Sequence, residues 1–260
     1  MRVPKPDQRR RLWIVSLTLF TLLFAINVST TGHRTAKVKA VNAVTANNHA
    51  NTGAALYDSL QLGNLGLSEE AFAYGMQGFQ RLLSGGRLRN DSVIAIIDYS
   101  LPSTRKRLFV IDIRNGKVLF NTLVSHGRNS GKVQATSFSN KPNSYKSSLG
   151  FYVTDRTYIG GHGLSLRLQG TEKGINDNAM ERAIVMHGAD YVNEDLISSQ
   201  GYIGRSLGCP ALPVDVHRKV IETIKNGTCL FLYSPNKNYI ARSKMLRQAK
   251  TEFALSTPVM

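Results

Sequence analysis

The sequence predicts a mostly β domain of the α+β class, with a few helices at its periphery. Three observations support this prediction. Short runs such as "VIAIIDY", "RLFVIDI" and "KVLFNTLVSHG" have β-type composition and are separated by turn sequences. Asn115-Gly116, between two of these runs, is a strong hairpin signal. Helical periodicity is confined to a few flanking segments. We therefore expect a β core over residues 93–234.

A helix is expected over residues 68–84, before the β core. Ser68 can cap its N-terminus, and the carboxylates of Glu69 and Glu70 fall in the first turn, where they favour a helix. The dipeptide Gly85-Gly86 ends it. Apolar residues recur along one face at helical spacing: Phe72, Met76, Phe79, Leu82 and Leu83. We interpret this helix as a structural brace.

Further segments complete a domain that we place at residues 63–235. "LGFYVT" and "RAIVMHG" have the composition of strands, "LPVDVHRKVIETIKNG" is an amphipathic helix closed by Gly227, and "TCLFLY" is a last strand. Residues 236–260 form a basic C-terminal tail, for which a terminal helix and a solvated chain both remain open. No internal repeat and no second large domain is evident.

Residues 1–27 are typical of a signal peptide or a membrane anchor. The basic stretch "MRVPKPDQRRR" precedes an apolar run from Leu12 to Ile26. This run is short for a bilayer span of about 20 residues but longer than a minimal signal core, so cleavage and anchoring both remain open. In either case the positive charges direct the rest of the chain outward. Residues 28–62, rich in Ala, Asn, Thr and Val, are expected to form a tether.

The chain is strongly basic, with Lys+Arg 33 against Asp+Glu 17 and a net charge of +16. This balance favours an anionic partner: nucleic acid, a membrane surface or a polymer such as a cell wall. No helix-turn-helix, zinc-finger or aromatic RNA-binding motif is evident, and export disfavours nucleic acid. The charge is therefore compatible with an anionic cell wall, although general solvation accounts for it equally well.

The two cysteines have different surroundings. Cys229 lies in the β-type run "GTCLFLY" and is typical of a small buried core residue. Cys209 lies in the glycine turn "GRSLGCPALP". A disulfide between them is the structural alternative in an oxidising compartment. We favour a free thiol at Cys209.

His187, which follows the apolar run "IVM", is the candidate base for this thiol. A free cysteine has a pKa of about 8.5 and becomes a good nucleophile when a histidine takes its proton. Gly208 lets the backbone approach a substrate carbonyl. Amides near Gly208 and Cys209 can form an oxyanion hole, an element typically worth about 2.7–4 kcal/mol. Pro210 fixes the exit of the turn. The pattern predicts nucleophilic catalysis by a cysteine–histidine pair.

Taken together, these stretches resemble one known family. "IVMHGADYV" followed by "IGRSLGCPALP" is similar to the His-Gly…Ser-x-Gly-Cys signature of the L,D-transpeptidase (YkuD-type) catalytic domain, and the "GCP" ending is closer to its second, divergent branch. The stretches "VIAIIDYSLPSTRKRLFVIDIRNGKVLFNTLVSHGRNSG" and "ATSFSNKPNSYKSSLGFYVT" are also similar to that branch. The resemblance runs from Leu67 to Ser234. It implies a compact β-sandwich or barrel with a few peripheral helices.

The resemblance assigns roles to four residues of the motif. Cys209 matches the nucleophile, His187 the general base, and Ser206 and Gly208 the Ser and Gly before the cysteine. The sequence departs from the commoner pattern at Leu207, where that pattern has a second histidine. Pro210-Ala211 also replaces an Ile/Val-Arg type of continuation. These departures bear on oxyanion stabilisation and on contacts to substrate carboxylates.

The implied activity is acyl transfer on the tetrapeptide stems of bacterial peptidoglycan, with no cofactor and no metal. Cys209 forms a thioester with the third stem residue, and D-alanine leaves. An amine acceptor then makes the protein a transpeptidase, whereas water makes it an L,D-carboxypeptidase. The implied partners are stem peptides, the anionic wall and, if the N-terminal segment is uncleaved, the inner membrane. The implied location is the periplasm or cell envelope.

Five further residues are candidates for substrate binding. Arg205, beside the cysteine motif, could contact a stem carboxylate, although a solvated arginine fits equally well. Gly188 leaves room beside the base. Tyr158 and His162 fall in the glycine-rich stretch "YIGGHGLSLRLQG", which we expect to be a loop near the site. His126 ends a strand and could line the cleft. Loop histidines are nevertheless more often merely exposed.

Two other classes of function compete with the cysteine acyltransferase. A zinc hydrolase would use His162, His187 and Cys209 as ligands, but the chain lacks close ligand spacing such as His-Glu-x-x-His or Cys-x-x-Cys. A non-catalytic wall-binding protein of the same fold is the more serious rival, and the departure at Leu207 motivates it.

Overall fold

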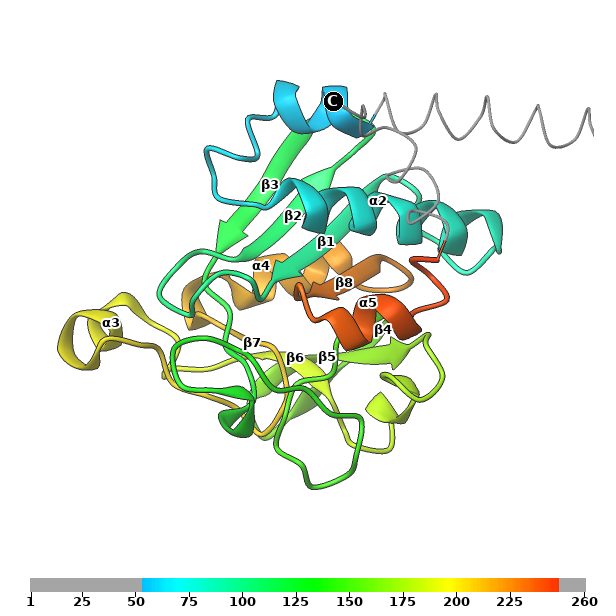
Figure 1. Ribbon diagram of the computed structural model, residues 1–260. Coiled ribbons are helices and arrows are strands. Elements are labelled where there is room, and N and C mark those ends of the chain that lie inside the picture. Colours follow the sequence, from blue (N-terminus) through cyan, green and yellow to red (C-terminus); the bar gives the residue numbers. More distant parts are fainter. Residues whose placement is uncertain (1–52, 248–260) are drawn as a thin grey trace, which may run out of the picture. The chain divides into compact units, whose positions relative to one another are not determined.

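The computed structural model describes residues 53–247 (Figure 1). The predicted signal or anchor at 1–27, most of the predicted tether and the last part of the basic tail lie outside these residues. Within the described part of the chain, every helix is too short or too polar to cross a bilayer.

Eight strands form one mixed sheet in the order β3-β2-β1-β8-β4-β5-β6-β7. Two neighbouring pairs, β1–β8 and β6–β7, are parallel, and the other five are antiparallel. The predicted mostly β class is therefore confirmed. The strands are β1 Val93–Asp98, β2 Leu108–Asp112, β3 Lys117–Thr122, β4 Gly150–Gly160, β5 Gly163–Gly170, β6 Val185–Gly188, β7 Ala211–Leu212 and β8 Cys229–Tyr233.

The sheet comes close to closing on itself because the chain beyond β3 runs along the β7 edge. Ser125 N–H donates to the Ala211 carbonyl over 2.8 Å, and Ser206 N–H donates to the His126 carbonyl over 3.0 Å. An isolated parallel bridge joins Gly127 to Ser206. These contacts give the nearly closed sandwich or barrel that the family resemblance implies.

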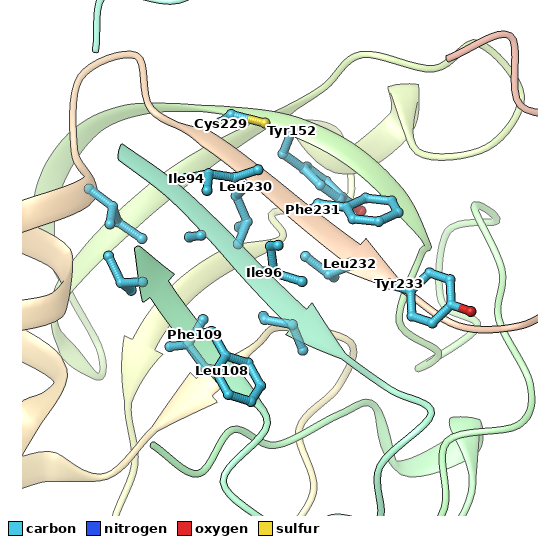
Figure 2. Close-up of a cluster of buried hydrophobic side chains, with 14 of the residues drawn as sticks. Ile94, Ile96, Leu108, Phe109, Tyr152, Cys229, Leu230, Phe231, Leu232 and Tyr233 are labelled. Atoms are coloured by element: carbon cyan, nitrogen blue, oxygen red, sulfur yellow. The ribbon is translucent and has the colours of Figure 1, made fainter. Parts of the chain in front are cut away.

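The centre of the core lies where β1, β8 and β4 run side by side (Figure 2). Ile94, Ile96 and Leu230 have no exposed surface. The rings of Phe151 and Phe231 stack with their centroids 4.1 Å apart. Because β1 is buried along its whole length, it reads as a continuous apolar run instead of an alternating one.

The predicted brace forms as α2 (Glu69–Ser84), with Ser68 as its cap and Gly85 after its last residue. It packs on β1 and β8. Two glycines allow this approach: a Cβ on Gly78 would lie 2.0 Å from the Phe151 ring, and one on Gly75 would lie 2.8 Å from Ile96. The helices that follow α2 are α3 (Glu194–Gln200), α4 (Val214–Ile224), α5 (Lys237–Arg242) and the short 3-10 turns η2 (Arg128–Ser130) and η3 (Asp177–Ala179).

The folded unit begins before residue 63 and continues past residue 235. Residues 53–59 are helical, Leu62 is fully buried, and Tyr57 Oη donates to the Leu67 carbonyl over 2.7 Å. The end of the expected tether thus belongs to the domain, because its few apolar side chains pack on the core. At the other end, the start of the basic tail forms α5.

Glu172 anchors α5 to the sheet. Its buried carboxylate accepts hydrogen bonds from Phe151 N–H (2.9 Å), Tyr239 Oη (3.1 Å) and Ser243 Oγ. Burial nevertheless raises the pKa of Glu172, because these three donors only partly replace the lost water.

We expect Glu172→Ala to destabilise the domain, because it leaves three buried hydrogen-bond donors without an acceptor. At roughly 1 kcal/mol for each hydrogen bond, the free energy of unfolding should fall by about 3 kcal/mol. The thermal midpoint should fall by roughly 6–12 °C, at about 2–4 °C per kcal/mol. Calorimetry would measure this. Glu222→Ala, at an exposed ion pair with Lys225, is the control and should change little. Equal midpoints for the two variants would contradict the prediction.

Candidate active site

The turn that carries Cys209 is shaped by Ser206 and Gly208. Ser206 Oγ accepts a hydrogen bond from Gly208 N–H (3.1 Å) and donates one to the Cys209 carbonyl (2.5 Å). Gly208 has φ +129°, and a Cβ there would lie 2.9 Å from the Lys146 carbonyl oxygen. Glycine is therefore required on both conformational and steric grounds. We call residues 206–210 the cysteine turn.

The Cys209 thiol is partly buried and contacts the main chain leading into β6. Its Sγ lies 3.4 Å from Val185 N and 3.7 Å from the Ala183 carbonyl oxygen. Burial raises the pKa of Cys209, while the Val185 N–H and the Arg182 charge oppose that rise. The thiol is thus mostly protonated at neutral pH, and a base is needed to activate it.

His187 has the properties of such a base. It is almost fully buried on β6, and its Nδ1 lies 2.9 Å from the Gly188 carbonyl oxygen, which can only accept. Nδ1 therefore carries the proton, and Nε2 is left with a free lone pair. Burial lowers the pKa of His187, and the neighbouring His162 and His217 add to this effect. The ring is neutral at pH 7.

The structure places Cys209 just before β7, the strand that pairs with the β6 of His187, but it does not join the two side chains by a hydrogen bond. In the parallel β6–β7 pair, His187 lies opposite Ala211, two residues after Cys209. His187 N–H also donates to the Pro210 carbonyl over 3.4 Å. However, the hydrogen-bond partners of Cys209 Sγ are main-chain atoms of Val185 and Ala183, and not the His187 ring.

His162 lies directly against the candidate base. It occupies the turn of the β4–β5 hairpin, where Gly160 pairs with Gly163. Its exposed ring stacks on His187, with centroids 4.4 Å apart and planes 20° from parallel. The stretch that we expected to be a loop is thus a hairpin, and the His162 ring at its tip covers His187, the candidate base.

A family model described as the L,D-transpeptidase catalytic domain matches residues 63–233. This chain belongs to that family. No curated protein sequence matches it.

Among solved structures, an L,D-transpeptidase from Mycobacterium smegmatis is 16% identical to this chain, with a TM-score of 0.34. The match covers 55% of this chain and 59% of the Mycobacterium smegmatis chain. The cell shape determining protein Pgp2 (K307A mutant) from Campylobacter jejuni is 15% identical, with coverages of 69% and 64% and a TM-score of 0.39. This chain thus spans about three fifths of the Mycobacterium smegmatis chain.

Three of the other expected site residues of this L,D-transpeptidase domain have structural contacts. A Cβ on Gly188 would lie 2.7 Å from the His217 ring, so this glycine lets α4 approach β6. Arg205 Nη1 donates to the carbonyls of Arg128 (3.1 Å) and Gly131 (3.2 Å). Tyr158 lies on β4 beneath the Arg167 guanidinium, 4.8 Å from its ring centroid.

The sequence suggested that His126 lines the cleft of the L,D-transpeptidase domain, but the structure places this residue in the interior. It has no exposed surface. Its Nδ1 accepts from Arg107 Nη2 (2.7 Å), and its Nε2 lies 3.2 Å from the Gly131 carbonyl oxygen. Burial and the Arg107 charge lower the pKa of His126 to about 4, so it stays neutral. A histidine at the end of a strand looks the same in sequence whether it faces solvent or the interior.

Of the two main-chain amides that we expected to form an oxyanion hole, those of Gly208 and Cys209, one already has a hydrogen-bond partner. Gly208 N–H is already bonded to Ser206 Oγ. Of the two amides, Cys209 N–H is the one without a partner among residues 53–247.

Sequence reasoning missed two residues near Cys209. Arg182 opposes the rise in the pKa of the thiol, and its Nη2 would lie 3.3 Å from a Cβ on Gly208. Burial, followed by the Cys209 charge, raises the pKa of Tyr191 to about 12. Their positions in "MERAIVMHGADY", on either side of His187, are the only sequence signal.

Both cysteines are free thiols. Within residues 53–247, no three His, Cys, Asp or Glu side chains are grouped so that they could hold a metal ion.

We expect Gly208→Ala to disturb the cysteine turn. The new Cβ would meet main-chain atoms, which cannot swing away, at a φ that L-residues avoid. The free energy of unfolding should fall by about 1–3 kcal/mol, and the alkylation rate of Cys209 should change. Thermal unfolding and iodoacetamide kinetics would measure these effects. Gly161→Ala, where the Cβ meets open space, is the matched control. If both variants match the native protein, the turn does not require glycine.

Proposed function

We propose that this domain is a cysteine acyltransferase, an L,D-transpeptidase that acts on the tetrapeptide stems of peptidoglycan, with Cys209 as nucleophile and His187 as base. Family membership supports the reaction class. The observation that carries the assignment of residues is the tautomer of His187. Its Nδ1–H is fixed on the Gly188 carbonyl, which leaves Nε2 free to take a proton beside the strand that follows Cys209.

The first half-reaction forms a thioester. The Cys209 side chain turns from Val185 N–H, and the Sγ proton passes to Nε2 of His187. The thiolate attacks the carbonyl carbon of the third stem residue. When the tetrahedral intermediate collapses, the bond to D-alanine breaks and His187 returns the proton to the leaving amine. Cys209 N–H is the proposed donor to the developing oxyanion.

The second half-reaction depends on the acceptor. An amine from a neighbouring stem gives a 3-3 cross-link and completes a transpeptidation. Water gives a tripeptide stem, which is the outcome of an L,D-carboxypeptidase. Both routes use the same thioester, and both place the protein in the cell envelope, where its net charge of +16 matches an anionic wall.

A second candidate, a non-catalytic wall-binding protein, is favoured by one observation. The Cys209 thiol is bonded to main-chain atoms, and burial raises its pKa. A thiol kept in that state would not react. The two candidates differ in whether Cys209 is required for any change in a muropeptide.

Cys209→Ala should abolish the release of D-alanine from purified tetrapeptide muropeptides, and His187→Gln should slow it by about 10²–10⁴-fold through loss of the base. Mass spectrometry of the products would measure both. Cys229→Ala, which removes a buried thiol of β8, is the control for general loss of cysteine. A dimeric product indicates transpeptidation, and a tripeptide alone indicates hydrolysis. If folded native protein leaves muropeptides unchanged, the enzymatic proposal fails and the wall-binding alternative gains.

The rate should rise with pH through the ionisation of His187, because only the neutral ring can accept the thiol proton. Burial lowers the pKa of His187. We therefore expect the acid limb to have its midpoint below about 6.5, the ordinary value for histidine. The pH profile of kcat/KM for D-alanine release would measure it. A midpoint above that value would show that His187 is not the neutral base described here.

A further inference from the structure

Arg182 is a half-buried cation that holds one wall of the site together. It lies between η3 and β6, and its guanidinium donates to four oxygen atoms of the segment at residues 139–148. Nη1 donates to the Ser139 carbonyl (2.8 Å) and to Ser148 Oγ (2.5 Å), and Nη2 donates to Ser144 Oγ (3.3 Å) and to the Lys146 carbonyl (2.7 Å).

All four of these acceptors are neutral. The ion pairs within residues 53–247 are Lys106–Glu194, Arg114–Asp91 and Lys225–Glu222. Arg182 therefore keeps its charge without a carboxylate beside it. A cation in such surroundings costs free energy unless a partner compensates it, and burial indeed lowers the pKa of Arg182.

The cysteine turn packs directly against this cation. The Lys146 carbonyl oxygen that receives Arg182 Nη2 also lies 2.9 Å from the position that a Gly208 Cβ would occupy. Nη2 itself lies 3.3 Å from that position. The residue after Arg182 is Ala183, whose carbonyl faces Cys209 Sγ. The guanidinium thus borders the cysteine turn at Gly208, and the residue that follows Arg182 contacts the thiol.

The other ionisable groups around Cys209 are either neutral or directed to another partner. Tyr99 and Tyr191 are phenols whose pKa values are raised, mainly by burial, so both are neutral. The Lys146 ammonium donates to Ser137 Oγ over 2.7 Å. His187, on β6, is neutral at rest. Of these groups, Arg182 is the one whose charge lowers the pKa of the thiol.

We propose that Arg182 is the counter-charge of the Cys209 thiolate and, through the Lys146 carbonyl, the residue that positions the cysteine turn. When the Sγ–H bond breaks, the proton goes to Nε2 of His187 and the electron pair stays on sulfur. The resulting anion forms next to the turn that Arg182 borders, and this guanidinium has no carboxylate partner among residues 53–247. Arg182 is thus already in place for a charge that exists only during the reaction. This inference rests on the proposed function, because it assigns the thiolate a role.

The test measures the thiol itself and does not need a substrate. The rate of alkylation of Cys209 by iodoacetamide is followed against pH in the full chain, with Cys209→Ala as the blank for the buried Cys229. In Arg182→Gln we expect the midpoint of the profile to rise and the rate at pH 7 to fall about tenfold, as for loss of one adjacent opposite charge. In Arg182→Lys, which keeps the charge but not the planar fork, we expect a rate within about threefold of the native one.

Arg128→Gln is the matched control. Arg128 is also an arginine close to the cysteine turn, since its N–H donates to the Ser206 carbonyl, but its exposed side chain stacks on Tyr145. Its loss removes the same charge from the protein and should leave the alkylation midpoint unchanged. Thermal unfolding of each variant reports any loss of structure.

A native midpoint in Arg182→Gln would overturn the proposal. Equal shifts in Arg182→Gln and Arg182→Lys would also overturn it, because the effect would then be structural and not electrostatic. Should Arg182→Gln not fold, Arg182→Lys decides alone, and a tenfold loss of rate would reject the role of the charge. Failure of the proposed function looks different: alkylation would still depend on Arg182, while native protein would leave muropeptides unchanged.

Discussion

The position of the cysteine turn depends on a cation buried in the interior. Arg107 has no exposed surface and donates to the Val124 carbonyl through both Nε (3.1 Å) and Nη2 (2.9 Å). Its Nη1 donates to the Leu101 carbonyl, and it lies over the Tyr99 ring. Such burial is tolerable only where every donor finds an acceptor. Arg107 thereby fixes the chain beyond β3, and this segment in turn bonds Ser206 and Ala211 on either side of Cys209.

Arg107 and Arg182 differ in what their charges do: the first has a structural role, and the second has the proposed role in the reaction. Arg107 donates to carbonyls and to His126, and burial together with the Arg107 charge keeps that histidine neutral. Arg182 is also held by neutral acceptors, but it borders the cysteine turn, and its charge opposes the rise in the pKa of the Cys209 thiol. In both cases a guanidinium donates to neutral acceptors. Arg107 thereby helps to close the sheet, whereas Arg182 leaves an uncompensated charge near Cys209.

The sequence was informative where periodicity or chain order decides the structure. The helix capped by Ser68, the buried run of β1 and the placing of Cys209 near His187 all follow from local patterns. The sequence was uninformative where partners come from distant segments. The serine-rich stretch at residues 137–148 has the composition of a solvated loop, yet Ser144 and Ser148 are acceptors for Arg182. The glycines around His162 suggested a loop because a tight hairpin turn and a flexible loop use the same residues.

The place of β8 in the sheet determines when the site can exist. Among residues 53–247 this strand is the last in sequence, yet it lies between β1 and β4 and pairs with both. A chain that ends before Cys229 would contain Cys209, His187, Arg107 and Arg182, but it would lack the strand that pairs with both β1 and β4. The strand pairing that joins β1 to β4 therefore needs almost the whole of the domain sequence. The complete sheet that positions Cys209 and His187 thus requires a segment that lies beyond both residues in the sequence.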